Sequence, residues 1–387
     1  MTNSINIEFW LKQLGLPTAD RHYQPGHTRM RSLLEQVVLA TPTLRIRIAG
    51  TNGKGSTAFM LSRALVDCGL KTGLYTSPHI HQFNERIQIN GLPISNTELL
   101  SLLNDLMPKA LEVGASYFEM ATVLALSFFS ARQVDVEILE AGVGARLDAT
   151  TAVPANMALI TPVGLDHQNW LGASLSDIAR EKAHAMNGCQ WAISAPQVPK
   201  VAEVLRSHKQ DIDILSQTTD LSNLAACGAH QRINADLAFA AVQRLKKQGY
   251  YNNSLDHARK VIAATLIPGR LQCIERGEMR FWLDAAHNQH AIEALLPSLE
   301  TLATPFEAIF VFCREDRCLS GSLNLLRPYT GRLITSAAMN GTSDASYKSL
   351  ADALQAEVCG LKQGSFLILG SFISVATAEK WINREKT

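Results

Sequence analysis

A glycine-rich run joins a predicted strand to a predicted amphipathic helix. It reads Ala49-Gly50-Thr51-Asn52-Gly53-Lys54-Gly55-Ser56-Thr57. Glycines allow backbone N–H groups to turn inward around phosphate oxygens, and a helix N-terminus adds partial positive charge. Lys54 would then neutralise the β- and γ-phosphates of a nucleotide. The spacing differs from the generic phosphate loop, because Ile48 replaces its first glycine and Gly55 its Ser/Thr. An ordinary strand–helix turn is the alternative, but the lysine and the strand–loop–helix context favour a phosphate site.

Short apolar runs alternate with helical patterns around this segment. We predict strands over residues 44–49, 72–75, 134–139, 157–161, 191–194 and 212–215. The predicted helices cover residues 56–68, 97–111, 118–131, 175–186, 199–207 and 234–247. Near-continuous apolar strands separated by helices are typical of a parallel sheet covered on both faces.

The alternation is interrupted at residues 266–270, where Pro268-Gly269 is a strong turn signal. It resumes with predicted strands over 271–275, 279–284, 308–312, 332–335 and 366–369 and helices over 291–302, 347–356 and 373–383. We therefore predict a two-domain α/β chain. Residues 1–266 would form a phosphate-loop domain on a parallel sheet, and residues 267–387 a smaller, Rossmann-like α/β domain. Ligands of open α/β sheets bind at the carboxyl ends of the strands, so we expect the active site in a cleft between the domains.

Composition and charge exclude several classes of protein. The 387 residues are 47% apolar, which excludes extended disorder. Lys and Arg total 36 against 35 Asp and Glu, so no global field attracts a nucleic acid. The N-terminal residues lack a signal-peptide core, and the longest strongly apolar stretch, 120–129, is about half a bilayer span. With seven scattered cysteines typical of reduced thiols, these features predict a cytoplasmic protein without a membrane partner.

Four polar residues follow predicted strands or open a predicted helix. Glu140 ends an apolar strand and is followed by glycines, which suits a Mg²⁺ ligand beside phosphates; a solvated loop charge is the alternative. Ser77 is held extended by Pro78 and is either a turn serine or a metal-bound hydroxyl. His167, taken alone, is more typical of a hydrogen-bonded structural histidine. Lys182 follows a capping-box start at Ser174 and, taken alone, is a surface lysine.

The glycine-rich run resembles the phosphate loop of the Mur ligase superfamily, in the form used by folylpolyglutamate synthase and dihydrofolate synthase. Further segments are similar to that family in its own order: Leu74-Tyr75-Thr76-Ser77-Pro78-His79, Phe83-Asn84-Glu85-Arg86-Ile87, Tyr117-Phe118-Glu119, Leu139-Glu140-Ala141-Gly142-Val143-Gly144-Ala145-Arg146-Leu147-Asp148-Ala149-Thr150, Gly164-Leu165-Asp166-His167, Trp170-Leu171-Gly172, Glu181-Lys182-Ala183, Pro268-Gly269-Arg270-Leu271, Asp284-Ala285-Ala286-His287-Asn288 and Gly370-Ser371-Phe372. The resemblance spans nearly the whole chain, and the ordered set is far more specific than any single motif.

The resemblance implies a two-domain Mur-ligase-like fold and a site residue by residue. It assigns the nucleotide ATP to Thr51, Asn52, Gly53, Lys54, Gly55, Ser56, Asn234, Arg270, Asp284 and His287. It assigns two Mg²⁺ ions to Ser77, Glu140, His167 and Lys182, with Lys182 N-carboxylated by CO₂. It assigns the pterin side of the acceptor to Ser116, Tyr117, Phe118, Glu119, Leu147, Asp148 and Ala149. It implies catalytic roles for Lys54, His167 and Lys182.

Alternatives remain for several of these residues, and the family pattern is not fully kept. Asp284 and Asn234 could be helix caps, and Tyr117 and Phe118 could be core aromatics. The sequence departs from the family at Ala145, Thr151 and Ala285, in the segments 22–29 and 188–230, and after Phe312, where Asp316 is the acid that remains. The phosphate and metal residues are intact, so these changes concern mainly the acceptor.

The resemblance implies an ATP-dependent amide ligase that adds L-glutamate to a folate-type carboxylate, dihydropteroate or tetrahydrofolate, through an acyl phosphate. The alternatives are a Mur-type ligase with another acceptor and a non-catalytic nucleotide-binding descendant. We expect small-molecule substrates, no nucleic-acid partner and a monomer.

Overall fold

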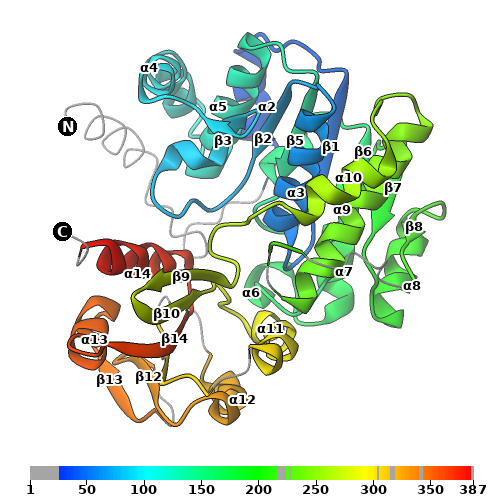
Figure 1. Cartoon of the computed structure of the whole chain (residues 1–387). Helices are drawn as coiled ribbons and strands as arrows, with labels where there is room; N and C mark the ends of the chain where they lie inside the picture. The colour runs from blue at the N-terminus through cyan, green and yellow to red at the C-terminus, as the bar shows by residue number, and fades with distance from the viewer. Residues whose placement is uncertain are drawn as a thin grey trace. The chain divides into compact units, whose positions relative to one another are not determined.

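The computed structural model describes residues 26–216, 224–226, 228–302, 305–313, 319–339 and 343–384. The described residues form two compact units (Figure 1). Unit 1 holds residues 26–216 and Ile233–Ala263, and unit 2 holds the described residues from 224 to 232 and from 264 to 384. The return of 224–232 to unit 2 is not predicted by the sequence pattern. Residues 22–25, 217–223 and Asp316, all in segments where the family pattern changes, lie outside the described residues.

Within the described residues, unit 1 is built on an eight-stranded sheet of order β4-β3-β2-β5-β1-β6-β7-β8. The strands are β1 (Leu44–Ala49), β2 (Thr72–Tyr75), β3 (Ile87–Ile89), β4 (Leu92–Pro93), β5 (Val136–Glu140), β6 (Met157–Ile160), β7 (Trp191–Ser194) and β8 (Asp213–Ile214). All pairs from β2 to β8 are parallel, as predicted. The edge strands β3 and β4 are antiparallel, which corrects the expectation of a purely parallel sheet. Asn90 and Gly91 between them have φ values of 53° and 79°, the backbone of a tight hairpin turn.

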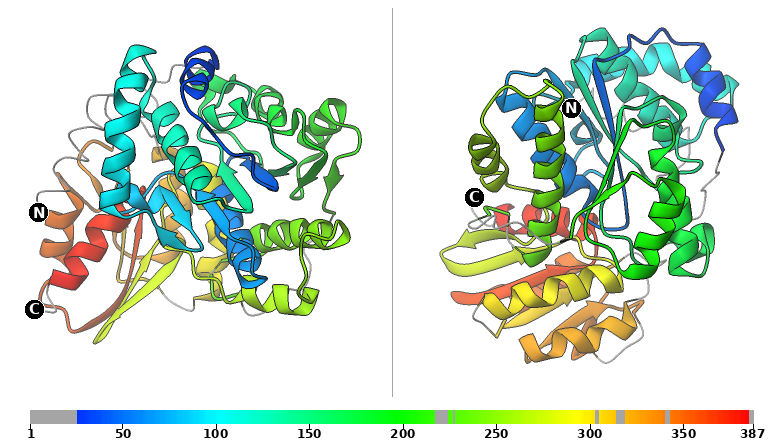
Figure 2. Two further views of the ribbon diagram at one scale, coloured as in Figure 1. Left: turned by 90° about the horizontal axis from the view of Figure 1, so that it is seen from above. Right: turned by 90° about the vertical axis from the view of Figure 1, so that its right-hand side faces the viewer.

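The helices of unit 1 cover both faces of this sheet, as Figure 2 shows in two turned views. They are α2 (Thr28–Glu35), α3 (Lys54–Asp67), α4 (Asn96–Glu112), α5 (Tyr117–Ala131), α6 (Gln168–Leu171), α7 (Leu175–Ala183), α8 (Pro199–His208), α9 (Ala229–Lys247, from Ile233 on) and α10 (Leu255–Ala263). α3 contacts β1, β2, β5 and α10. α9 begins at Ala229, so the predicted start at 234 is wrong by more than one turn.

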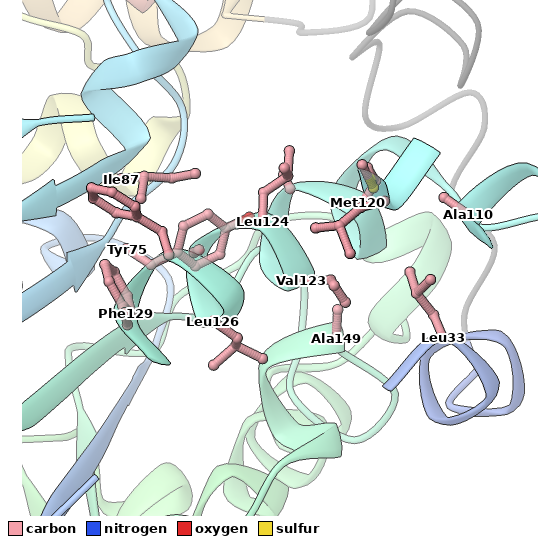
Figure 3. Packing of buried hydrophobic residues seen from close by; sticks show 14 of the residues in the cluster. Leu33, Tyr75, Ile87, Ala110, Met120, Val123, Leu124, Leu126, Phe129 and Ala149 are labelled. Atoms are coloured by element: carbon pink, nitrogen blue, oxygen red, sulfur yellow. The ribbon is translucent and has the colours of Figure 1, made fainter. Parts of the chain in front are cut away.

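One apolar cluster of unit 1 lies around α5 (Figure 3). Met120, Val123 and Leu124 of α5 pack with Leu33 of α2 and with Tyr75 at the end of β2. α5 is apolar on nearly every side, which is typical of a helix buried between a sheet and other helices. The helix begins at Tyr117, so this packing fixes the residues at its N-terminus.

Unit 2 is built, in its described part, on a six-stranded sheet of order β13-β12-β11-β14-β10-β9. The strands are β9 (Gln272–Arg276), β10 (Glu278–Leu283), β11 (Ala308–Val311), β12 (Leu333–Ser336), β13 (Ala345–Tyr347) and β14 (Gln363–Leu369). The helices are α11 (Gln289–Thr301), α12 (Leu323–Leu326), α13 (Leu350–Glu357) and α14 (Phe372–Arg384). β9 pairs antiparallel with β10 and the other pairs are parallel. The predicted helix at 347 begins later, at Leu350, because the chain first forms β13. None of the helices within the described ranges combines the length and apolar character that a membrane crossing requires.

Candidate active site

The glycine-rich run turns sharply between β1 and α3. α3 begins at Lys54, and Gly53 before it has a φ of 90°, in the left-handed region. A Cβ atom on Gly53 would lie 2.0 Å from Oδ1 of Asn234, and one on Gly50 would lie 1.9 Å from Oγ1 of Thr161. Both positions therefore require glycine, for the backbone angle and for the close approach of a neighbour. The predicted strand–loop–helix context of the phosphate loop is confirmed.

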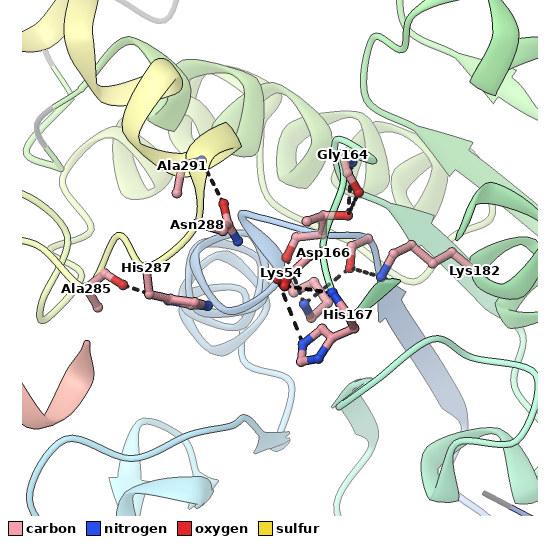
Figure 4. Close-up of polar contacts among 11 residues, drawn as sticks. Lys54, Gly164, Asp166, His167, Lys182, Ala285, His287, Asn288 and Ala291 are labelled. Carbon is pink, nitrogen blue, oxygen red and sulfur yellow. Dashed lines mark hydrogen bonds and ion pairs between the residues drawn. The ribbon is translucent and has the colours of Figure 1, made fainter. Parts of the chain in front are cut away.

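Thr51 ties this loop to the segment that follows β6. Its Oγ1 and the backbone of Gly164 exchange two hydrogen bonds of 3.0 Å, and its N–H donates to the carbonyl of Pro162 at 3.0 Å. The same segment carries His167 close to the loop (Figure 4). His167 has a φ of 52° and is the N-cap of α6. Its Nε2 lies 3.8 Å from Oδ2 of Asp166, whose other oxygen accepts the His167 N–H.

Lys182 is buried beside the loop, with 3% of its surface exposed, so the alternative of a surface lysine is wrong. Its Nζ donates to the Gly50 carbonyl at 2.7 Å. Lys54 Nζ donates to that same carbonyl at 3.2 Å and to the Thr51 carbonyl at 3.0 Å. Burial, and then the charge of Lys54, lowers the pKa of Lys182 to about 7. The predicted capping box of α7, with Ser174 as N-cap, is present and orients the helix that carries Lys182.

Glu140 ends β5, beside β1, and is 4% exposed. Its Oε2 accepts the Ser77 N–H at 2.9 Å, and a Cβ on Gly55 would lie 3.4 Å from the same oxygen. Ser56 Oγ is buried and makes no hydrogen bond among the described residues. Carboxylate and hydroxyl oxygens are what Mg²⁺ prefers, so these residues fit that ion. The described residues contain no cluster of three or more His, Cys, Asp or Glu suited to a metal, so water and phosphate oxygens would have to complete the shell.

The N-terminus of α5 carries four of the residues assigned to the acceptor. Ser116 caps the helix, and Glu119 Oε2 accepts the Ser116 N–H at 2.7 Å and Arg29 Nε at 3.0 Å. Glu119 Oε1 is buried and has no hydrogen-bond partner within the described ranges. Tyr117 belongs to the core cluster and Phe118 packs at its border. Glu119 therefore offers a buried acceptor atom that has no partner among the described residues.

The segment after β5 carries the other acceptor candidates. Asp148 is buried, and its Oδ2 accepts the backbone N–H groups of residues 142 and 143 at 2.9 and 3.2 Å. Its Oδ1 accepts the N–H and Oγ1–H of Thr150, and burial raises the pKa of the carboxyl. Ala149 lies in the core cluster and Leu147 is half-buried. Both oxygens of Asp148 thus shape the loop that follows Glu140.

Asp284 and Asn234 are not helix caps. In unit 2, Asp284 accepts the N–H groups of Leu271 and Ala286, both at 2.8 Å, and the N-cap of α11 is Asn288. In unit 1, Asn234 lies inside α9 and packs against the phosphate loop. The capping alternative is wrong for both residues.

Two more nucleotide candidates lie in unit 2. Arg270 stacks on Phe372, with 4.7 Å from its Cζ to the ring centroid. His287 Nδ1 donates to the Ala285 carbonyl at 2.8 Å, which fixes the ring orientation (Figure 4). Each of these side chains is thus held in place by a neighbour in its own unit.

One cluster was not assigned a role by the sequence. Arg86, 5% exposed, donates from Nε to His79 Nδ1 at 2.9 Å. Its Cζ lies 5.8 Å from the Phe83 ring centroid and 5.6 Å from that of Tyr117. Burial, and then the charge of Arg86, lowers the pKa of His79 to about 4. The sequence signal for this cluster was the motif Phe83-Asn84-Glu85-Arg86-Ile87, but the spacing alone did not indicate its chemistry.

Comparison with known proteins places the chain among ligases. No protein-family model matches it. It is 32% identical over 314 residues to the dihydrofolate synthase/folylpolyglutamate synthase of Bacillus subtilis, covering 72% of each chain. It is 30% identical over 375 residues to the protein of that name from Escherichia coli, covering 88% of this chain and 87% of that one. Among solved structures, Escherichia coli FolC in complex with DHPP and ADP has a TM-score of 0.85, with 28% identity and 98% coverage of both chains. Mycobacterium tuberculosis folylpolyglutamate synthase, complexed with ADP and AMPPCP, has a TM-score of 0.83, with 26% identity and 99% coverage of both chains.

Proposed function

The chain belongs to the dihydrofolate synthase/folylpolyglutamate synthase family, and from that premise we propose that it is an ATP-dependent ligase joining L-glutamate to the carboxylate of a folate-type acceptor. The observation that carries the proposal is the meeting of Lys54 and Lys182 at one carbonyl of the phosphate loop, with Glu140 against the same loop at Gly55. A module that only binds nucleotide has no need of a second buried lysine there.

The proposed reaction has two steps. An oxygen of the acceptor carboxylate attacks the γ-phosphorus of ATP, which forms an acyl phosphate and releases ADP. The amine of glutamate then attacks the acyl carbon, loses a proton and releases phosphate, which leaves an amide. Little covalent chemistry falls to the protein, so positioning and charge neutralisation dominate. Lys54, at the N-terminus of α3, offsets charge on the β- and γ-phosphates.

Ser77 and Glu140 would hold one Mg²⁺, and His167 and Lys182 a second. When bound, these ions neutralise phosphate and carboxylate charge. The support for the first is the oxygen donor set, together with the buried Ser56 hydroxyl of the phosphate loop, which makes no hydrogen bond among the described residues. The support for the second is that both residues lie near the phosphate loop: the segment that carries His167 is hydrogen-bonded to Thr51, and Lys182 donates to the Gly50 carbonyl.

Lys182 is proposed to act as a carbamate. CO₂ adds to a neutral amine, and a lysine whose pKa is about 7 supplies that form at neutral pH. The carbamate anion would face Lys54, whose Nζ shares the Gly50 carbonyl with Lys182. An unmodified ammonium at this position would instead repel both Lys54 and a cation.

The remaining nucleotide contacts are proposed for the backbone of Thr51 to Ser56, Asn234, Arg270, Asp284 and His287. The acceptor is proposed to contact Ser116–Glu119 and Leu147–Ala149. Among these, the buried Oε1 of Glu119 is suited to N–H donors such as those of a pterin ring, because it has no partner among the described residues. The other acceptor residues would contribute shape rather than hydrogen bonds.

The test is an ADP-release and product assay with L-glutamate and three conditions: dihydropteroate, tetrahydrofolate and no acceptor. We expect ADP formation that depends on an acceptor, with a glutamylated product identified by mass. ADP formation absent with every acceptor would favour the non-catalytic alternative. Turnover with neither folate acceptor, but with another carboxylate, would favour a different Mur-type ligase. The expected monomer is checked by light scattering, and the expected cytoplasmic location by fractionation.

A further inference from the structure

Arg86 is a buried cation whose outer edge is left for a ligand. Its Nε is used by His79, and the rings of Phe83 and Tyr117 lie near the guanidinium. Among the described residues it has no carboxylate within ion-pair distance and no hydrogen bond from either Nη nitrogen. Those nitrogens are also not among the side-chain atoms sealed from solvent without a partner. Up to four N–H donors of the guanidinium therefore have no partner among the described residues, and a pair of parallel N–H donors binds a carboxylate in a bidentate manner.

Three carboxylates of unit 1 are engaged by other partners. Glu85 accepts the N–H groups of residues 80–82. Glu119 pairs with Arg29, and Glu140 accepts the N–H of Ser77. A buried guanidinium without a counter-ion is costly, so an anion that arrives with a substrate would be strongly favoured.

Arg86 lies near residues that are proposed to bind the metal and the acceptor. Its carbonyl accepts the N–H of Thr76 at 3.0 Å, which places it beside Ser77. Its ring neighbour Tyr117 is the first residue of α5, and the N-terminus of that helix adds partial positive charge. The backbone of Arg86 therefore adjoins the segment of Ser77, which is proposed for the first Mg²⁺, and its guanidinium adjoins Tyr117, which is proposed for the acceptor.

We propose that Arg86 binds the non-reacting carboxylate of an acceptor that ends in glutamate. This rests on the proposed function and adds a specificity residue to it. An acceptor that ends in benzoate, such as dihydropteroate, has one carboxylate, which reacts. An acceptor that ends in glutamate has two, so one remains for Arg86. Arg86 is thus needed for the second kind of acceptor and dispensable for the first.

The test compares pteroate with pteroylglutamate as ligands, by calorimetric titration in the presence of Mg²⁺ and ADP. The variants are Arg86→Met, which keeps the stem between the rings, and Arg86→Lys. Arg132→Met is the matched control, because Arg132 lies 5.7 Å from the Phe128 centroid but is paired with Glu98. We expect Arg86→Met to weaken pteroylglutamate about 10- to 100-fold and pteroate by less than about twofold, as for loss of a charged hydrogen bond. Arg86→Lys should be intermediate, and Arg132→Met should match the wild type.

Four results would overturn the proposal. Equal weakening of both ligands would make Arg86 structural, and unchanged pteroylglutamate affinity, or no wild-type affinity for it, would remove its role. A raised KM for L-glutamate with dihydropteroate would assign Arg86 to the incoming amino acid. Failure of the proposed function is seen separately, as wild-type protein that binds these ligands and forms no product with either acceptor.

Discussion

Two lysines meet at one backbone carbonyl of the phosphate loop. Lys54 and Lys182 are 128 residues apart, yet both donate to the carbonyl of Gly50. One is half-exposed at a helix start, and the other is enclosed by protein. Burial lowers the pKa of Lys182 and so favours its neutral form. Two residues of one type therefore have separate chemical roles.

Lys54→Ala is expected to lower kcat by about 10²- to 10³-fold, because it removes a fixed cation from the developing phosphate charge. The melting temperature should change little, since the side chain is half-exposed and donates to two loop carbonyls. Steady-state ADP release and thermal denaturation measure the two effects. Near-normal turnover in this variant would remove the assignment of the phosphate loop.

The low pKa of Lys182 predicts that stability depends on pH, and the proposed carbamate predicts that activity depends on CO₂. Its folded pKa of about 7 lies below the usual 10.5, so between these values the unfolded chain binds more protons and stability rises with pH. Lys182→Met should lose that part of the slope in urea unfolding measured across this window. Activity should fall in CO₂-depleted buffer and return with bicarbonate, more readily above pH 7 than below it.

The proposed carbamate also predicts how substitutions of Lys182 affect activity. Lys182→Ala should lose activity by orders of magnitude and be partly rescued by short-chain carboxylic acids, which replace the missing anion. Lys182→Arg should stay inactive. An active Lys182→Arg enzyme would show that positive charge suffices, and the carbamate would then be wrong.

At the scale of elements, the loop between β1 and α3 is fitted to two other segments. Gly50 lies against Thr161 at the end of β6, and Gly53 lies against Asn234 of α9. These contacts explain why a run with unusual spacing still forms a phosphate loop: its shape is set by neighbours as well as by its own glycines.

Gly53→Ala and Gly69→Ala separate backbone strain from crowding. Both glycines have a φ of 90°, but a Cβ on Gly69 meets nothing within 4 Å, while one on Gly53 meets Asn234. We expect Gly69→Ala to cost about 1–2 kcal/mol of unfolding free energy and Gly53→Ala to cost more and to weaken nucleotide binding. Denaturant unfolding and nucleotide titration measure both. Equal costs and unchanged affinity would mean that the contact with Asn234 has no consequence.

At the scale of the whole molecule, the proposed nucleotide ligands are divided between two folding units. Lys54 and Asn234 belong to unit 1, and Arg270, Asp284 and His287 belong to unit 2. Each unit has its own sheet and its own apolar core. A ligand bound by residues of both would stabilise both.

Hydrogen exchange of the full chain can test this division. A non-hydrolysable ATP analogue with Mg²⁺ is expected to slow exchange in peptides covering residues 50–57 and in peptides covering 284–288. Lys54→Ala should reduce the protection in both regions at the same ligand concentration. Protection confined to residues 50–57 would contradict the proposed roles of Asp284 and His287.

Local pattern was sufficient for much of this protein. β1, β2 and β7 have the bounds expected from their apolar runs, and the capping box expected at Ser174 of α7 is present. Strand ends, glycine turns and helix caps depend on residues close together in the chain, so the sequence reveals them directly. The family resemblance rested on the same kind of short, ordered motifs. The antiparallel edge at β3 and β4 was missed because its strands are two or three residues long, too short for a periodic signal.

Tertiary structure alone decided the charge environment of the site. The burial of Lys182, the engagement of both oxygens of Asp148 and the absence of a carboxylate beside Arg86 in the described residues all depend on segments distant in sequence. Desolvation and hydrogen bonding are set by whatever packs around a group, not by its neighbours along the chain. The sequence therefore identified the ionisable side chains of the site. The packing of α7, β5 and η1 (Phe83–Arg86) determined their burial and their hydrogen-bond partners.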